Sequence, residues 1–142
     1  MASLARAMAT LRITGDDLVP AEVTAALGCE PTRSWAKGDT VTSSQRPTPR
    51  TARFGMWSLE ADDTAPADVD EQVNAILDRL TTDEMVWGRL RARYNVNLFW
   101  GWFMDRVNEG VSIEPETMSA LGARGILLDV DLYGGPVDEP SE

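Results

Sequence analysis

Two aspartates near the end of the chain have a spacing that suits chemistry. Asp129 and Asp131 stand at i and i+2, so a strand projects both carboxylates from one face, about 7 Å apart. Carboxylates at this separation can bridge a metal ion or divide acid and base roles. The alternative is a solvated strand face with ion pairs to arginines. The sequence favours that alternative, because no third ligand stands nearby.

A second polar cluster lies between Arg33 and Asp39, where Trp35 and Lys37 alternate with small residues. A lysine, an aspartate and an indole so close together can bind a small anion or a partner side chain. The competing interpretation is a turn closed by Gly38. We favour the turn, because no phosphate-cradling glycine pattern accompanies the lysine.

The residue types that are missing exclude most familiar chemistry. The sequence has no histidine and a single cysteine, Cys29. Nucleophilic triads, cysteine-rich zinc sites and an internal disulfide are therefore ruled out. We predict no catalytic residue, no metal and no cofactor, and we interpret Cys29 as a small buried filler.

Five tryptophans are many for 142 residues. We assign Trp57, Trp100 and Trp102 to the core, because they fall in apolar, strand-like segments. Trp35 and Trp87 lie in less regular context. Burial is favoured for these two as well, but they are the better candidates for an exposed recognition surface.

The net charge of −10 is unevenly distributed. Residues 1–53 carry seven basic and five acidic groups, whereas residues 54–142 carry six basic and eighteen acidic groups. Such a surface repels nucleic-acid backbones and attracts a basic protein partner. Solubility alone is the simpler explanation of the charge.

The elements that must position these residues follow from hydrophobic periodicity. We expect strands at 5–14, 32–37, 54–61, 96–103 and 126–133, and helices at 20–27, 69–80, 83–91 and 115–121. The second and third strands pair antiparallel across a mobile surface loop at about 42–53, which is too rich in Ser, Thr, Pro and Arg for a core element. Residues 134–142 form an acidic, flexible tail.

Several finer expectations can be compared with a structure. Gly28 and Gly122 end the first and last helices. Met85, Val86 and Leu90 pack inward from the third helix, and its arginines face water. The strand at 96–103 is apolar on both faces, so we expect it in the middle of the sheet and under cover.

Two helices resemble each other in sequence, since EVTAALG at 22–28 is echoed by ETMSALG at 116–122, each after a proline. The echo suggests two related strand-helix units. We therefore expect a single α+β domain over residues 1–133, with a mainly antiparallel sheet and helices packed on one face. A pseudo-duplicated, ferredoxin-like arrangement is one form of this fold.

The same segments carry a family resemblance. The stretch from Pro20 to Thr32, then Lys37 to Asp39, then Trp57, and finally Leu121-Gly122 before the strand that ends at Tyr133, resembles the bacterial domain of unknown function 4279. The resemblance spans roughly residues 7–133. It supports the fold and implies no catalytic or ligand residue.

These observations favour a noncatalytic interaction module over an enzyme. One form is an immunity or accessory protein in the bacterial cytoplasm that acts on a basic protein partner, without nucleic acid or membrane. The rival is a small-ligand sensor or atypical enzyme with a tryptophan-lined pocket. A third possibility is an oligomeric domain whose edge strands pair between copies. The sequence does not define the oligomeric state.

Overall fold

A computed structural model describes residues 6–42, 47–62, 68–104 and 110–134. Within these ranges the elements are, in chain order, β1 (Arg6–Gly15), α1 (Pro20–Leu27), β2 (Arg33–Trp35), β3 (Thr40–Val41), β4 (Arg50–Thr51), β5 (Gly55–Glu60), α2 (Val69–Leu77), α3 (Glu84–Arg93), β6 (Asn95–Phe103), α4 (Pro115–Arg124) and β7 (Leu127–Tyr133). The expected elements are all present, and β3 and β4 are additions.

The main sheet has five strands in the order β2-β5-β1-β6-β7. Its first three pairings, β2 with β5, β5 with β1 and β1 with β6, are antiparallel, and only β6 and β7 are parallel. Without α4 and β7, the path β1-α1-β2-β5-α2-α3-β6 has the strand order of a ferredoxin-like fold. The mainly antiparallel α+β architecture is therefore confirmed, with one strand-helix unit added beyond its ferredoxin-like part.

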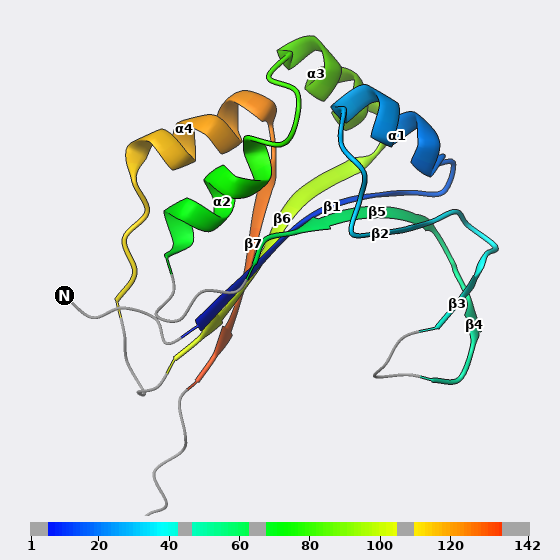
Figure 1. Ribbon diagram of the computed structural model, residues 1–142, viewed down its shortest axis with the longest axis horizontal. Helices are drawn as coiled ribbons and strands as arrows, with labels where there is room; N and C mark the ends of the chain where they lie inside the picture. The colour runs from blue at the N-terminus through cyan, green and yellow to red at the C-terminus, as the bar shows by residue number, and fades with distance from the viewer. Residues whose placement is uncertain (1–5, 43–46, 63–67, 105–109, 135–142) are drawn as a thin grey trace, which may run out of the picture.

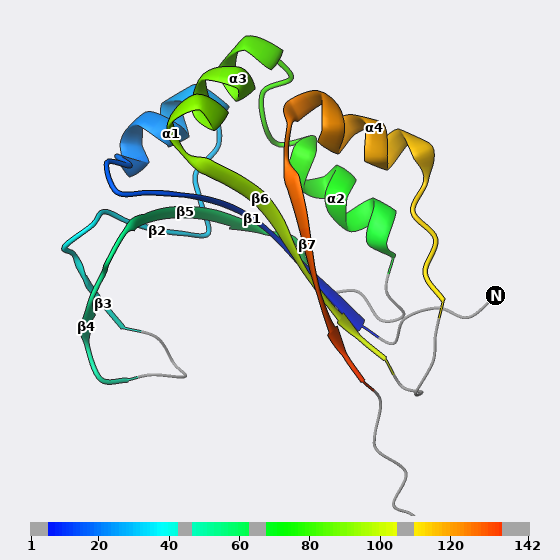
Figure 2. The same ribbon diagram turned by 180° about the vertical axis from the view of Figure 1, so that it is seen from behind.

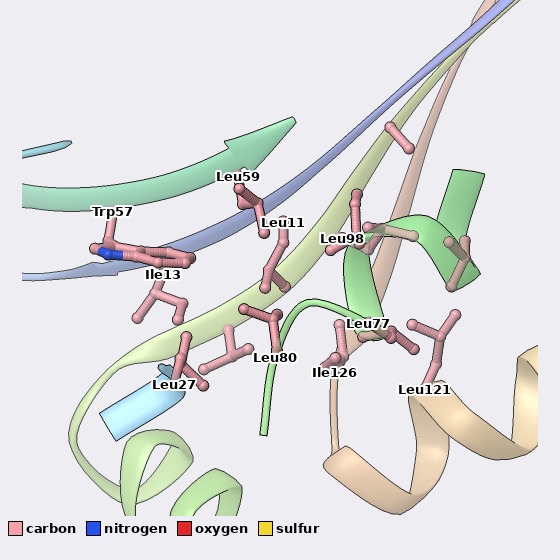
Figure 3. Close-up of a cluster of buried hydrophobic side chains, with 14 of the residues drawn as sticks. Leu11, Ile13, Leu27, Trp57, Leu59, Leu77, Leu80, Leu98, Leu121 and Ile126 are labelled. Atoms are coloured by element: carbon pink, nitrogen blue, oxygen red, sulfur yellow. The ribbon is translucent and has the colours of Figure 1, made fainter. Parts of the chain in front are cut away.

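The four helices of the described residues lie on the same side of the main sheet, while the β3–β4 ribbon extends away from them (Figures 1 and 2). The core fills the space between sheet and helices (Figure 3). The alternation of β1 explains its position at the centre, because Ala7, Ala9, Leu11 and Ile13 are all buried toward the helices. Their neighbours in sequence therefore project from the opposite face of the sheet.

The helix starts follow the signals in the sequence. Pro20 opens α1, and Gly28 ends it with a φ of 77°. Asp68 caps α2 by accepting a hydrogen bond from the backbone N–H of Glu71 at 3.0 Å. Asp70 instead accepts bonds from α4, from the Thr117 hydroxyl at 2.7 Å and from the Glu114 N–H at 3.0 Å. Asp68 thus stabilises its own helix, and Asp70 ties α2 to α4.

Two expectations about helices are wrong. The helix α4 continues through Gly122 and ends before Gly125, which has a φ of 66°. A glycine stops a helix only where the backbone turns left-handed, and only Gly125 does so here. In α3 the side chain of Met85 is 71% exposed instead of packing inward, whereas Leu90 is buried as expected.

The segment predicted as a mobile loop contains regular structure. Within its described part, Arg50 and Thr51 form β4, which pairs with β3, and Ala52 is buried. The prediction that this segment supplies no core element did not anticipate β4, a two-residue strand whose side chains are both exposed. Residues 43–46, and residues 135–142 of the expected tail, lie outside the described residues.

The echoed segments both form helices that follow a strand, α1 after β1 and α4 after β6. Their surroundings differ, because β5 separates β1 from β2 whereas β6 and β7 are direct neighbours. The two halves of the ferredoxin-like part are instead β1-α1-β2 and β5-α2-α3-β6. The echo therefore does not coincide with these halves.

The strand β6 lies between β1 and β7, as its apolar sequence predicts. The expected cover exists on one face only, since no described helix packs on the other face (Figures 1 and 2). None of the described helices is both long and apolar enough to span a bilayer.

Candidate functional site

The face of the sheet without helices carries four of the residues singled out from the sequence. Ser58 pairs with Arg33 and Met56 with Trp35, which places Arg33 and Trp35 on this face at the β2 edge. Asp129 and Asp131 lie on the same face at the β7 edge, beside Phe99 and Gly101. Three strands separate the two edges, about 19 Å at normal strand spacing. The structure therefore does not bring these four residues into one site.

Arginine and aromatic side chains alternate across the middle of this face. The Arg12 guanidinium lies 4.4 Å from the ring centre of Phe99, and that of Arg6 lies 5.1 Å from the ring centre of Phe103. The Phe103 ring stacks on Tyr133 with centres 4.7 Å apart. The sequence analysis missed this arrangement because it expected β6 to be covered. The signal was the spacing of two phenylalanines on one face of a strand.

Gly101 lies beneath this aromatic pair. A Cβ atom at Gly101 would be 3.5 Å from the Phe103 ring and 3.6 Å from the Tyr133 ring. A side chain at this position would therefore press on both rings, and glycine leaves room for them.

A groove of about 1150 Å³ lies where β1 ends and β6 begins. Arg12, Arg91 and Arg93 line it, together with the amide side chains of Asn95 and Asn97. Asp16, Asp17 and Tyr94 complete its polar lining. The groove could not be predicted from the sequence, since its residues come from β1, the start of β5, α3, β6 and the start of β7, and no short motif joins them.

The arginines that line the groove differ in their contacts. Arg93 forms ion pairs with Asp17 at 3.4 Å and Glu22 at 3.6 Å. Its pKa is raised, first by Tyr94 and then by the hydrogen bond to Asp17. Arg91 lies against Gly125, where a Cβ atom would come within 2.3 Å of its Cδ and Nε atoms. Glycine at 125 is therefore needed for the position of Arg91 as well as for the helix end.

Tyr94 is the buried wall of the groove. Its ring packs on Gly15, where a Cβ atom would lie 2.7 Å from the Tyr94 Cδ1 atom. The hydroxyl is buried and has no hydrogen-bond partner among the described residues. A second, apolar pocket of about 420 Å³ between α1 and α3 is also lined by Tyr94, so this ring borders both cavities.

The Lys37 cluster has the geometry of a closed turn. The Asp39 carboxylate accepts a bond from the Ala36 N–H at 2.9 Å, and Gly38 has a φ of 92°. The Trp35 indole donates to the Phe54 carbonyl at 3.1 Å, while Arg33 lies 5.2 Å from its ring centre. Asp39 is therefore engaged within the turn, and Lys37 extends from it into solvent.

The tryptophans are buried largely as expected. Trp87 is fully buried, as the favoured interpretation predicts, and its indole donates to the Thr81 carbonyl at 2.8 Å. The alternative of an exposed recognition residue at Trp87 is wrong. Trp57 and Trp100 are buried as predicted, and Trp35 and Trp102 are half-buried.

Asp129 and Asp131 of β7 have different hydrogen-bond partners. Asp129 accepts a bond from the Asn97 amide at 2.5 Å, and Asp131 accepts one from the Tyr133 hydroxyl at 3.4 Å. Within the described ranges no three carboxylate or thiol residues gather closely enough to hold a metal ion. The opposite face of β7 exposes apolar side chains, with Leu128 and Val130 each 37% and Leu132 63% exposed.

Comparison with known proteins gives a family. The model of the family described as Domain of unknown function (DUF4279) matches residues 5–135. The chain belongs to the DUF4279 family. No curated protein and no solved structure matches this DUF4279 chain. The expected family is confirmed, and the site of this DUF4279 protein must be argued from its own geometry.

Proposed function

We propose that this protein is a noncatalytic binding module that takes an extended segment of a basic partner protein as an added strand beside β7. The observation that carries the proposal is the outer edge of β7, which has no strand beside it among the described residues and combines exposed apolar residues with two acids. Strand addition of this kind supplies affinity through main-chain hydrogen bonds and specificity through alternate side chains.

The two edge strands of the main sheet differ in how well they are protected against pairing with a strand of another chain. The edge strand β2 has three residues and carries Arg33, so it offers a short and charged template. The edge strand β7 has seven residues without proline or lysine, and its only charged side chains are Asp129 and Asp131. Proline and charged side chains, lysine above all, normally blunt an edge. Because both charges of β7 are acidic, they oppose pairing with an acidic strand and leave the edge open to a basic one.

The side chains of β7 define the chemistry of the partner. Leu128, Val130 and Leu132 face the helix side and suit apolar residues at alternate positions of an added strand. Asp129 and Asp131 face the other side and suit Lys or Arg at the positions between. The partner segment therefore alternates basic and apolar residues.

A second copy of this chain fits the edge less well. Antiparallel pairing of two β7 strands about Val130 would set Asp129 opposite Asp131 of the copy, twice over because the interface is symmetric. Like charges directly opposite destabilise a strand pair. This charge pattern favours a basic partner over self-association.

The proposal includes a cellular setting. We place the module in the bacterial cytoplasm, as an immunity or accessory protein, and assign it no nucleic-acid or membrane partner. The free thiol of Cys29 is compatible with a reducing compartment, and the net charge of −10 opposes binding to phosphate backbones.

A peptide titration tests the proposal. The probe is an extended peptide in which Lys and Val alternate, and its control is a peptide of the same composition in which the alternation is scrambled. We expect the alternating peptide to bind and to slow hydrogen exchange of the β7 amides. The double variant Asp129→Lys and Asp131→Lys should weaken binding about tenfold or more, because the two strands then repel each other.

The matched control has the same change in net charge at two exposed acids outside β7, Glu30→Lys with Asp78→Lys. Binding to this control should change far less than to the β7 variant. Equal losses in both variants, or binding of the scrambled peptide with the same affinity, would show that only overall charge matters and would overturn the proposal.

A further inference from the structure

The groove at the end of the sheet contains a concentration of positive charge in an acidic protein. Three arginines, Arg12, Arg91 and Arg93, line it against two aspartates, whereas the whole chain has a net charge of −10. An arginine cluster of this kind attracts anions locally, while the surrounding acidic surface repels long polyanions. The charge distribution therefore suits a small anion.

Two of these arginines have no counter-ion in the part of the chain that the structure describes. Arg93 is neutralised by Asp17 and Glu22. For Arg12 and Arg91, no described carboxylate lies within ion-pair distance. Their guanidinium groups retain donors that match the planar oxygens of a carboxylate or phosphate.

The same two side chains are positioned by packing. Arg12 is half-buried in the middle of the sheet, with its guanidinium 4.4 Å from the ring centre of Phe99. Arg91 rests on the bare backbone of Gly125. Because these contacts restrict both side chains before binding, less conformational freedom is lost when a ligand is held.

The rest of the lining includes aromatic and apolar surface. Tyr94, which is 6% exposed, forms a fixed wall of the groove. Phe54 and Met56 line the same groove and offer apolar surface beside the polar groups.

We propose that this groove binds a small organic anion, whose phosphate or carboxylate contacts Arg12 and Arg91 and whose flat apolar body lies against Phe54 and Met56. The site is separate in chemistry from the strand addition at β7, since it takes an anion where β7 takes a basic segment. The groove would thus give the protein a second binding activity, for a small anion, in addition to partner binding at β7.

Calorimetric titration of the full chain with phenyl phosphate, benzoate, inorganic phosphate and uncharged phenol tests the site. We expect phenyl phosphate or benzoate to bind, inorganic phosphate to bind more weakly, and phenol not to bind. The stronger of the two aryl anions identifies the anionic group. Absence of binding by every anion, or binding of phenol as tight as that of the anions, would overturn the proposal.

Three variants locate the binding. Arg12→Gln and Arg91→Gln should each weaken the bound aryl anion about tenfold or more, since each removes a charged donor. Arg12→Lys keeps the charge but loses the planar fork, and it should give an intermediate loss. Thermal unfolding of each variant verifies that it remains folded.

The matched control is Arg89→Gln, which removes the same charge from α3 at a residue that lines the apolar pocket but not the groove. Its affinity for the aryl anion should stay close to that of the parent chain. A loss equal to that of Arg91→Gln would assign the effect to net charge and reject the groove as the site. Peptide binding at β7 is measured in parallel, so failure of one proposal leaves the other testable.

Discussion

Gln72 is the buried polar residue that connects the helices to the sheet. Its amide donates to the Ala7 carbonyl at 2.7 Å and to the Asp62 carbonyl at 3.2 Å, and its oxygen accepts from the Trp100 indole at 3.3 Å. The side chain is 2% exposed. One amide thus satisfies groups from β1, from the segment after β5 and from β6, none of which has water as an alternative.

Replacing the Gln72 amide should destabilise the folded protein. We expect Gln72→Leu to lower the free energy of unfolding by about 2–3 kcal/mol, because it leaves the Ala7 carbonyl and the Trp100 N–H buried without partners. Urea denaturation monitored by tryptophan fluorescence gives the value. The same change at exposed Asn74 in α2 is the control and should alter stability by less than about 0.5 kcal/mol. Equal effects at the two positions would contradict the assigned role.

The burial of single residues was predictable where the apolar residues of a strand or helix follow a regular spacing. The period-two pattern of β1 matches its buried residues, Ala7, Ala9, Leu11 and Ile13. In α3 the prediction was correct for Leu90 and wrong for Met85. The residues that pack inward are Trp87, Leu90 and Tyr94, at i, i+3 and i+7, which is a helical period. The signal was present in the sequence, but Trp87 was not assigned to it.

Two glycines of α4 provide a test at the scale of the element. Gly122 lies inside the helix, and a Cβ atom there would meet nothing within 4 Å. Gly125 follows the helix with a φ of 66° and supports Arg91. The helix boundary is therefore set by the backbone conformation at 125.

Alanine at the two positions should have opposite effects. Gly122→Ala should raise the free energy of unfolding by about 0.5–1 kcal/mol, because alanine loses less backbone entropy in a helix. Gly125→Ala should lower it by about 1 kcal/mol or more, since alanine disfavours a positive φ and its Cβ displaces Arg91. Thermal and urea unfolding of the two variants measure both changes. A stabilising Gly125→Ala would place the helix end elsewhere.

The elements themselves were largely predictable, but their environment was not. Proline starts, helix-period apolar stripes and period-two strands are local signals, and they located α1, α2, β1 and β7. Whether a strand is central, at an edge or covered depends on which strands pair with it. The exposed apolar face of β7 and the uncovered face of β6 are such properties. The groove likewise exists only once β1, α3 and β6 meet.

The charge of the whole molecule should control association with a basic partner. We expect binding of the alternating Lys and Val peptide to weaken about tenfold between about 50 mM and about 500 mM sodium chloride, mainly through a slower association rate. Stopped-flow fluorescence at several salt concentrations measures the rates. A peptide with Gln in place of Lys serves as the reference and should show little dependence on salt. If the Lys peptide behaves like this reference, charge does not steer the encounter.

The placement of β1 affects how the molecule is made. This strand is the first of the described elements to be synthesised, yet it is the centre of the sheet, with Gly15 opposite Gly55 and Arg6 opposite Phe103. A nascent chain can pair β1 with β5 only after Glu60 has been added, and with β6 only after Phe103, so β1 stays incompletely paired through most of translation. Chaperones that recognise extended apolar segments should therefore find β1 first.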